Sequence, residues 1–179
     1  GEAMQRATPP GTGAMAALLG AELAQAQAIC DAAKADPETG AEEVVETAAR
    51  LLGLKLKVSR VTFGEFDDEH DLVHIRRGWT AEGAETHPAT LQQSDFLGPL
   101  LDELRAGVTV RFDDVGEPPY VRPDLEALAA IGVRAGLSVP LIDSGRLALN
   151  LMVHNHEPYS WTDAEVALAQ ETAERTWAA

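Results

Sequence analysis

The sequence predicts an α+β domain, in which an antiparallel sheet carries the two terminal helices on one face and a pocket covered by loops and short helices on the other. Three observations predict it. Two apolar strands in 133–153 pivot on Asp143-Ser144-Gly145, which is typical of a hairpin. A capping box, Thr162-Asp163-Ala164-Glu165, follows and opens a last helix over 162–179. Two amphipathic helical patterns precede the first strand-like alternation.

The first half of the chain begins with a small, polar stretch at 1–13, which we expect to be a disordered linker or a cloning remnant. A helix over 14–36 follows, with a stripe at Met15, Leu18, Leu19 and Leu23. A second helix starts after Pro37, and Gly53 is expected to be its C-cap. The period then changes from 3.6 to 2, which predicts strands at 58–66 and 72–78 around an acidic turn.

The second half of the sequence contains the segments that are predicted to cover the sheet. Residues 79–93 are expected to form a loop or to include a short strand. Ser94 is expected to cap one helix that runs to Leu104 and stops at Gly107. A short strand is predicted at 108–112, and Pro123 opens a further helix. The segments 79–93 and 94–131 must cover the second face of the sheet. A sheet covered in this way commonly encloses a small-molecule cavity.

The amino-acid composition excludes several classes of function. The chain has 179 residues, enough for one domain, and 45% of them are hydrophobic. Its 29 acidic and 14 basic residues give a net charge of −15, which argues against nucleic acid and anionic membranes as partners. No apolar run reaches the roughly 20 residues that span a bilayer, and no signal peptide is visible. Cys30 is the single cysteine, so a disulfide framework is excluded and a cytoplasmic location is expected.

Three segments carry a resemblance to a known family: LLGLKLKVSRVTFGEFD, SDFLGPLLDELRAGVTVRFDDV and IGVRAGLSVPLIDSGRLALNLMVHNHEPYSWTDAEVALAQETAERTW. Together they resemble a bacterial GAF domain, the sensory module of histidine kinases and phytochromes. The resemblance covers about two thirds of the chain, from Leu51 onward. It implies one GAF-like domain over 14–179, including both terminal helices. Because GAF domains differ widely in ligand, the resemblance does not name one.

Phytochrome GAF domains allow a closer comparison. PDLEALAAIGVRAGLSV is similar to their bilin-contacting helix and strand, and LALNLMVHNHEPYSW to the strand that ends in paired histidines. The resemblance places Asp124 where those domains have a helix histidine, and His154 and Asn155 where they have two histidines. The Asp-Ile-Pro motif is absent near 113–121, and no cysteine follows Cys30. Covalent bilin is therefore not expected and no cofactor is assigned, while binding of a non-covalent small molecule stays open.

The residues themselves suggest further pocket candidates. Arg134 could bind a carboxylate or phosphate, or form a structural salt bridge with an acidic neighbour. Phe63, Phe112 and Tyr120 could line a pocket or pack in the core, and His154 could donate a hydrogen bond in the pocket. The predicted ligand-binding set is Phe63, Phe112, Tyr120, Asp124, Leu128, Arg134, His154 and Asn155.

Other clusters have weaker alternatives. His154 and His156 share one strand face and could bind a haem or a metal, but His156 is expected to be exposed at the strand end. The acidic run 67–71 lacks the glycine and glutamate spacing of a calcium loop, so a solvated turn is expected. Asp113 and Asp114 have no nucleophile nearby in sequence and are expected in a turn. No metal site and no catalytic residues are predicted.

Together these observations predict a sensory or regulatory domain of a two-component histidine kinase type, and not an enzyme. The terminal helices are expected to form a homodimer and to control an output kinase domain, because the last helix ends at Trp177 without a cap and is expected to continue. Two alternatives stay open: a bilin- or haem-binding photosensor or redox sensor, and a dimerisation scaffold that binds no ligand.

Overall fold

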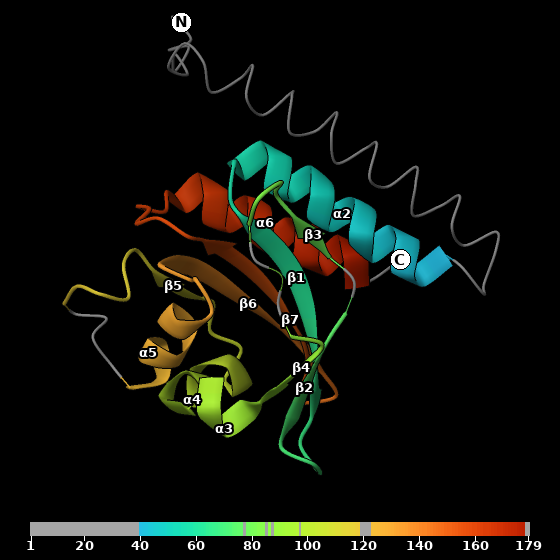
Figure 1. Ribbon diagram of the computed structural model, residues 1–179. Coiled ribbons are helices and arrows are strands. Elements are labelled where there is room, and N and C mark those ends of the chain that lie inside the picture. The colour runs from blue at the N-terminus through green and yellow to red at the C-terminus, as the bar shows by residue number, and fades with distance from the viewer. Residues whose placement is uncertain are drawn as a thin grey trace, which may run out of the picture.

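The protein has three layers, with one sheet in the middle and helices on each of its two faces (Figure 1). The structure is a computed structural model and describes residues 40–76, 78–84, 86, 88–96, 98–118 and 123–177. Helices α2 (Gly40–Leu56) and α6 (Asp163–Trp177) pack on each other over one face of the sheet. We call the cover of the other face the roof; it consists of α3 (Gln93–Phe96), α4 (Gly98–Arg105) and α5 (Pro123–Ala130). The predicted linker 1–13 and helix 14–36 lie outside the described residues.

The sheet has seven strands, and each described pairing is antiparallel. Its order is β4-β2-β1-β7-β6-β5, and β3 pairs with the start of β1. This arrangement confirms the predicted α+β class. The strands are β1 (Arg60–Asp67), β2 (Leu72–Ile75), β3 (Trp79–Thr80), β4 (Thr90–Gln92), β5 (Val110–Phe112), β6 (Ala135–Asp143) and β7 (Arg146–Asn155).

The predicted hairpin and capping box are confirmed. Strands β6 and β7 join through Ser144 and Gly145, whose φ angles are 50° and 78°. Two consecutive positive φ angles match the twist of a two-residue hairpin turn. At the start of α6, Thr162 donates its backbone N–H to the Glu165 carboxylate (2.8 Å), and Glu165 N–H donates to Thr162 Oγ1 (3.3 Å). Both segments therefore adopt the structure that their local sequence predicted.

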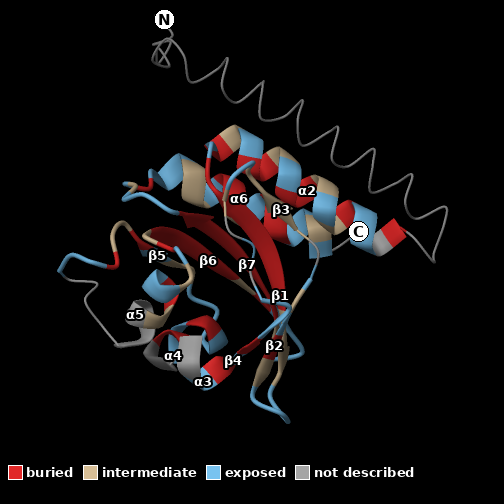
Figure 2. Cartoon of the chain, in the orientation of Figure 1, coloured by how far each residue is buried: buried red, intermediate tan, exposed pale blue. Residues whose placement is uncertain are grey.

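The main core lies between the sheet and the pair α2 and α6, and Figure 2 shows the buried residues concentrated there. Val61 and Phe63 on β1 and Leu151 on β7 have no exposed surface. Ala169 and Ala173 on α6 are equally buried, and their small side chains let the helix approach the strands closely. Because side chains alternate along a strand, the residues between these apolar ones face the roof.

Helix α2 corrects one prediction, because it runs through Gly53 and ends at Leu56. Lys57 has a left-handed φ of 55°, and Val58 N–H donates to the Gly53 carbonyl (3.3 Å), which is a Schellman-type ending. Gly53 has a different role. A Cβ at this position would lie 2.1 Å from Trp79 Cε3, so the glycine allows the β3 indole to pack against the helix.

The predicted helix from Ser94 to Leu104 is also corrected, because it is divided into α3 and α4. Pro99 is the second residue of α4 and cannot donate the N–H that a continuous helix needs there, although it is well tolerated in a first turn. Ser94 lies inside α3, and its hydroxyl donates to Asp71 Oδ2 (2.8 Å). The predicted strand 72–78 likewise ends early, at Ile75.

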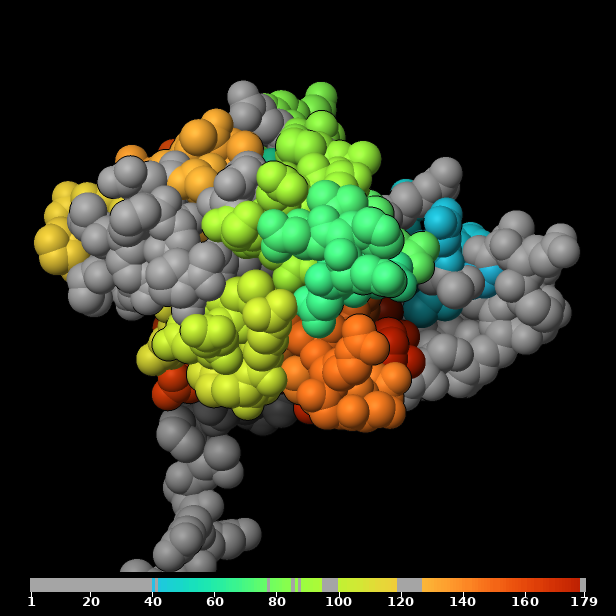
Figure 3. Space-filling model, turned by 90° about the horizontal axis from the view of Figure 1, so that it is seen from below, coloured from blue at the N-terminus to red at the C-terminus, as the bar shows by residue number. Residues whose placement is uncertain are grey.

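Seen from below, the β1–β2 turn, helix α4 and the β6–β7 turn lie side by side at one end of the sheet (Figure 3). Arg105 on α4 pairs with Asp68 in the first of these turns (2.9 Å) and links the roof to the hairpin. In the described part of the chain, no helix is long and apolar enough to cross a membrane. The site described below lies at the opposite end of β1, beside Arg60.

Replacing Phe63 with Ala should lower the free energy of unfolding by about 3–5 kcal/mol, because it removes a fully buried ring from the main core. Urea unfolding followed by circular dichroism measures the change. Val108→Ala is the control, since Val108 is 50% exposed between α4 and β5 and should change stability by less than about 0.5 kcal/mol. Equal effects of the two substitutions would contradict the assignment of Phe63 to the core.

Candidate functional site

A row of buried polar side chains lines the roof-facing side of the central strands. We call it the polar row: Arg60 and Thr62 on β1, Ser138 on β6, and Asn150 and His154 on β7, all 5% exposed or less. These residues alternate with the apolar core positions, and Arg60 is the direct cross-strand partner of His154. Buried positions are usually apolar, so a row of buried polar side chains is an unusual feature of this side of the sheet.

Part of the polar row is not satisfied within the protein. Among the described residues, Thr62 Oγ1 and both polar atoms of the Asn150 amide are buried and have no hydrogen-bond partner. Leaving a buried polar group without a partner costs about 1–3 kcal/mol. Such groups in native proteins call for a specific explanation, commonly contact with water or a ligand.

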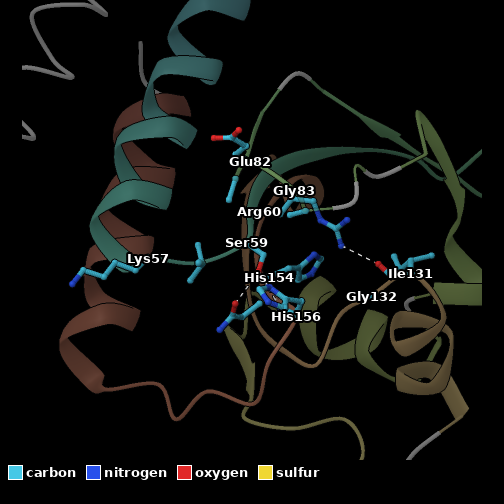
Figure 4. A pocket seen from close by; sticks show the side chains of 13 residues that line it. Lys57, Ser59, Arg60, Glu82, Gly83, Ile131, Gly132, His154 and His156 are labelled. Atoms are coloured by element: carbon cyan, nitrogen blue, oxygen red, sulfur yellow. Dashed lines mark hydrogen bonds between the residues drawn. The ribbon is translucent and has the colours of Figure 1, made fainter.

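A cavity of about 570 Å³ opens at the end of this face where β1 begins (Figure 4). Four segments that are distant in sequence form its wall: the residues that follow α2, the loop after β3, the end of α5 and the end of β7. The lining residues are Lys57, Val58, Ser59, Arg60, Ala81, Glu82, Gly83, Ala84, Ile131, Gly132, His154, Asn155 and His156.

Arg60 and His154 form the polar floor of the cavity. Arg60 Nη2 donates to the Ile131 carbonyl (3.3 Å), which connects β1 to the segment after α5. Gly136, the β6 partner of His154, makes room for the imidazole. A Cβ at position 136 would lie 2.5 Å from Phe112 Cζ and 3.1 Å from His154 Cδ2. The glycine therefore lets Phe112 and His154 pack over the strand.

Ser59 connects two segments of the cavity wall. Its hydroxyl donates to Asn155 Oδ1 (2.8 Å) and accepts the backbone N–H of His156 (3.1 Å), and it also contacts His156 Nδ1. Ser59 follows α2 closely, and Asn155 is the last residue of β7. The serine thus joins the chain that leaves α2 to the chain that leads toward α6.

The predicted ligand-binding residues are distributed over several places. His154 and Asn155 line the cavity. Phe63 lies in the main core on the other face of the sheet. Phe112 and Leu128 belong to a second core cluster, beneath the roof. Asp124 lies on α5, but its side chain is outside the described part of the structure, as is the whole of Tyr120.

Arg134 forms the structural salt bridge that the sequence left as one of two alternatives. Its Nη2 donates to Asp114 Oδ1 (2.7 Å) and Oδ2 (2.8 Å), and its Nε donates to Oδ1 (2.9 Å). The Gly116 N–H also donates to Asp114, and this bond, together with the Arg134 guanidinium, lowers the pKa of the Asp114 carboxyl. This bidentate pair fixes the turn between β5 and α5, and Arg134 is not among the cavity-lining residues.

The other clusters have local explanations. Asp67 accepts the backbone N–H groups of Glu69 and His70, which closes the acidic turn. His156 is exposed at the end of β7, whereas His154 is buried. Within the described ranges, no group of three or more histidine, cysteine or acidic side chains is placed to hold a metal ion.

Sequence reasoning missed most of the cavity lining, including Ser59 and Arg60, and it also missed Gly136 beside His154. A signal for Arg60 was available, because the period-2 pattern of 58–66 sets it opposite Val61 and Phe63. A cation at a strand position whose face is covered by further segments is unusual and points to a site. No local signal marks Ser59, because its partners come from β7.

Comparisons with known proteins identify the family. The sequence profile of the GAF domain family matches residues 36–179, which is well over half of the chain. The chain belongs to the GAF domain family. No curated protein matches the sequence.

Solved structures of other proteins show the same fold. The blue-light-absorbing PixJ GAF domain of Thermosynechococcus elongatus is 23% identical with a TM-score of 0.64, over 88% of this chain and 86% of that one. A phycoerythrobilin-bound GAF domain of a cyanobacterial phytochrome is 16% identical with a TM-score of 0.71, over 88% and 91%. The free methionine-R-sulfoxide reductase of Neisseria meningitidis is 18% identical with a TM-score of 0.67, over 97% and 92%. At these identities the similarity shows the fold alone.

Replacing Asp114 with Asn should destabilise the protein near neutral pH and flatten its acid denaturation. Because the folded pKa of Asp114 is lowered, its contribution to stability is present above the ordinary carboxyl pKa and is lost as the pH falls through the lowered value. The difference in unfolding free energy between wild type and variant should therefore shrink from about pH 7 to about pH 2. Urea titrations across this range measure it, with the exposed Asp102→Asn as control. A pH-independent difference would contradict the ion-pair assignment.

Proposed function

We propose that this GAF domain is the ligand-binding regulatory module of a bacterial cytoplasmic signalling protein of the two-component histidine kinase type. A non-covalent small molecule binds in the cavity and shifts the arrangement of the flanking helices, and an output domain responds to that shift. One observation carries the proposal: a cavity of about 570 Å³, within the usual size of small-molecule sites, adjoins a buried polar row that contains unpartnered atoms.

The Ser59 contacts supply a route from the cavity to the helices. Lys57, Val58 and Ser59 line the cavity and follow directly on α2. Asn155 and His156 also line it and begin the connection that leads to α6. Since Ser59 is bonded to both of these residues, and α2 packs on α6, a ligand that moves one segment changes the other. This coupling supports a regulatory role.

We propose binding rather than catalysis. A reductase cycle that ends in an intramolecular disulfide needs two cysteines, and the chain has one. Ser59 contacts a histidine, but its hydroxyl donates to an amide oxygen of Asn155, which does not activate it as a nucleophile.

We further propose that the domain forms a homodimer through its terminal helices, 14–36 and 162–179, together with the neighbouring α2. Leu54 on α2 and Trp177 on α6 are 54% and 49% exposed, although both are large apolar side chains. Exposed apolar groups on packed helices favour helix-to-helix association, because a second copy would bury them.

The ligand proposal predicts that the freshly purified protein retains a small molecule or binds one saturably. Native mass spectrometry and absorbance detect it, and expression with biliverdin or haem should leave the protein colourless. Ala84→Trp should reduce retention at least about tenfold by filling the cavity, whereas Ala106→Trp, at an exposed position away from the cavity, should not. Retention that is unchanged by Ala84→Trp, or no binding by wild type, would contradict the proposal.

The dimer proposal predicts a concentration-dependent monomer–dimer equilibrium in sedimentation velocity at micromolar concentration. Leu54→Glu should shift it toward monomer by about tenfold or more in dissociation constant, because it places a charge in the interface. Ile142→Glu is the control, since Ile142 is similarly exposed (41%) but lies on β6 next to the β6–β7 turn. A wild-type monomer at all concentrations would rule out this interface.

A further inference from the structure

We infer that the cavity recognises the anionic group, a carboxylate or phosphate, of a small organic molecule whose body is otherwise apolar, and that Arg60 binds this anion with His154 beside it. The inference rests on the proposed ligand-binding function and specifies its ligand class. Figure 4 shows Arg60 and His154 on neighbouring strands within the cavity wall.

The charge of the cavity is opposite to that of the chain. Acidic residues outnumber basic ones by 29 to 14 in the whole sequence. Among the described lining residues this ratio is reversed: they include Lys57, Arg60 and two histidines, and Glu82 is the one acid among them. A local excess of cationic and N–H donor groups in an acidic protein indicates a site for negative charge.

Arg60 has the burial that a recognition residue needs. It is 3% exposed, so water screens its charge weakly and a contact with an anion is strengthened. Its guanidinium carries five N–H donors in a planar fork. One nitrogen donates to the Ile131 carbonyl, and the fork can hold a protein partner and a ligand oxygen at once.

A second arginine, Arg134, lies outside the cavity lining. Arg134, which the sequence singled out for an anion, already binds both oxygens of Asp114. Displacing that carboxylate would leave Asp114 in need of a new partner. Arg60 lines the cavity and Arg134 does not, so the anion-binding role belongs to Arg60.

The remaining wall defines the body of the ligand. Val58, Ala81, Ala84 and Ile131 present aliphatic groups, and Gly83 adds no side chain. These aliphatic groups lie beside polar ones at Ser59, Glu82, Asn155 and His156, and together with the buried cation they fit an acid with an apolar body. The inferred ligand class is an aromatic or aliphatic acid, or the phosphate ester of such a group.

The test compares charged and neutral probes of nearly equal shape on the whole chain. Phenylacetate is compared with phenylacetamide, and phenyl phosphate with benzyl alcohol, by titration with ¹⁵N detection of the arginine and histidine side chains at constant ionic strength. At least one anion should shift the Arg60 and His154 signals saturably and bind at least about tenfold more tightly than its neutral partner. The Arg111 signal should not respond, since Arg111 pairs with Asp163 on the surface.

Substitutions of Arg60 and Arg111 test whether the anion binds at Arg60. Arg60→Gln should weaken anion binding about tenfold or more while it leaves the neutral probe unchanged, and Arg60→Lys should retain part of the preference. Arg111→Gln is the matched control and should have no effect. If Arg60→Gln does not fold, the comparison of charged and neutral probes on the unchanged chain decides the matter alone.

The outcomes separate this inference from the proposed function. Equal binding of neutral and charged probes would overturn the anion inference and leave the ligand-binding function intact. No saturable shift of cavity residues by any probe would overturn the inference, and retention of a natural molecule by native mass spectrometry would then decide the function separately. A response to the carboxylate alone, or to the phosphate alone, would support the inference and name the acid.

Discussion

The two-sided character of the central strands is the constraint on which the rest of the structure depends. On β1, Val61 and Phe63 must be buried against α2 and α6, where they contribute most of the hydrophobic stabilisation of that strand. Alternation then forces Arg60 and Thr62 to face the roof. A shift of register by one residue would place the Arg60 guanidinium in the main core and Phe63 in the polar row. The position of the site is therefore a consequence of hydrophobic packing on the opposite face.

Two glycines make this packing possible, and neither is at a turn. Gly53 lets Trp79 approach α2, and Gly136 lets Phe112 and His154 lie over β6. In both places a Cβ would come closer than 3.0 Å to an aromatic ring. The first contact fixes the helix pair to the edge of the sheet, and the second fixes the floor of the cavity. On each side of the sheet, an aromatic ring thus packs directly against the backbone of a glycine.

The acidic surface and the basic cavity have different consequences for an anionic ligand. The net charge of −15 repels anions at a distance, but at physiological ionic strength the Debye length is about 8 Å, so this repulsion is short-ranged. For an anion bound beside Arg60, the contact with this buried cation would outweigh the distant charges, because screening is weak there. Recognition would then depend on contact rather than on long-range attraction, which favours a ligand with an apolar body that adds binding energy of its own.

The sequence alone determined the parts of the protein that depend on near neighbours. The β6–β7 hairpin, the capping box of α6 and the period-2 pattern of β1 were predicted because each results from residues a few positions apart. Tertiary structure decided the rest. Gly53 reads locally as a helix end, yet its role depends on Trp79, and Pro99 divides a helix that the apolar spacing had joined. His154 and Asn155 were found in the sequence, but Arg60 and Ser59 reach them only because β1 pairs with β7, and no local pattern records that pairing. The site is formed by the segments that adjoin the ends of α2, β3, α5 and β7, so it exists only once the sheet has formed.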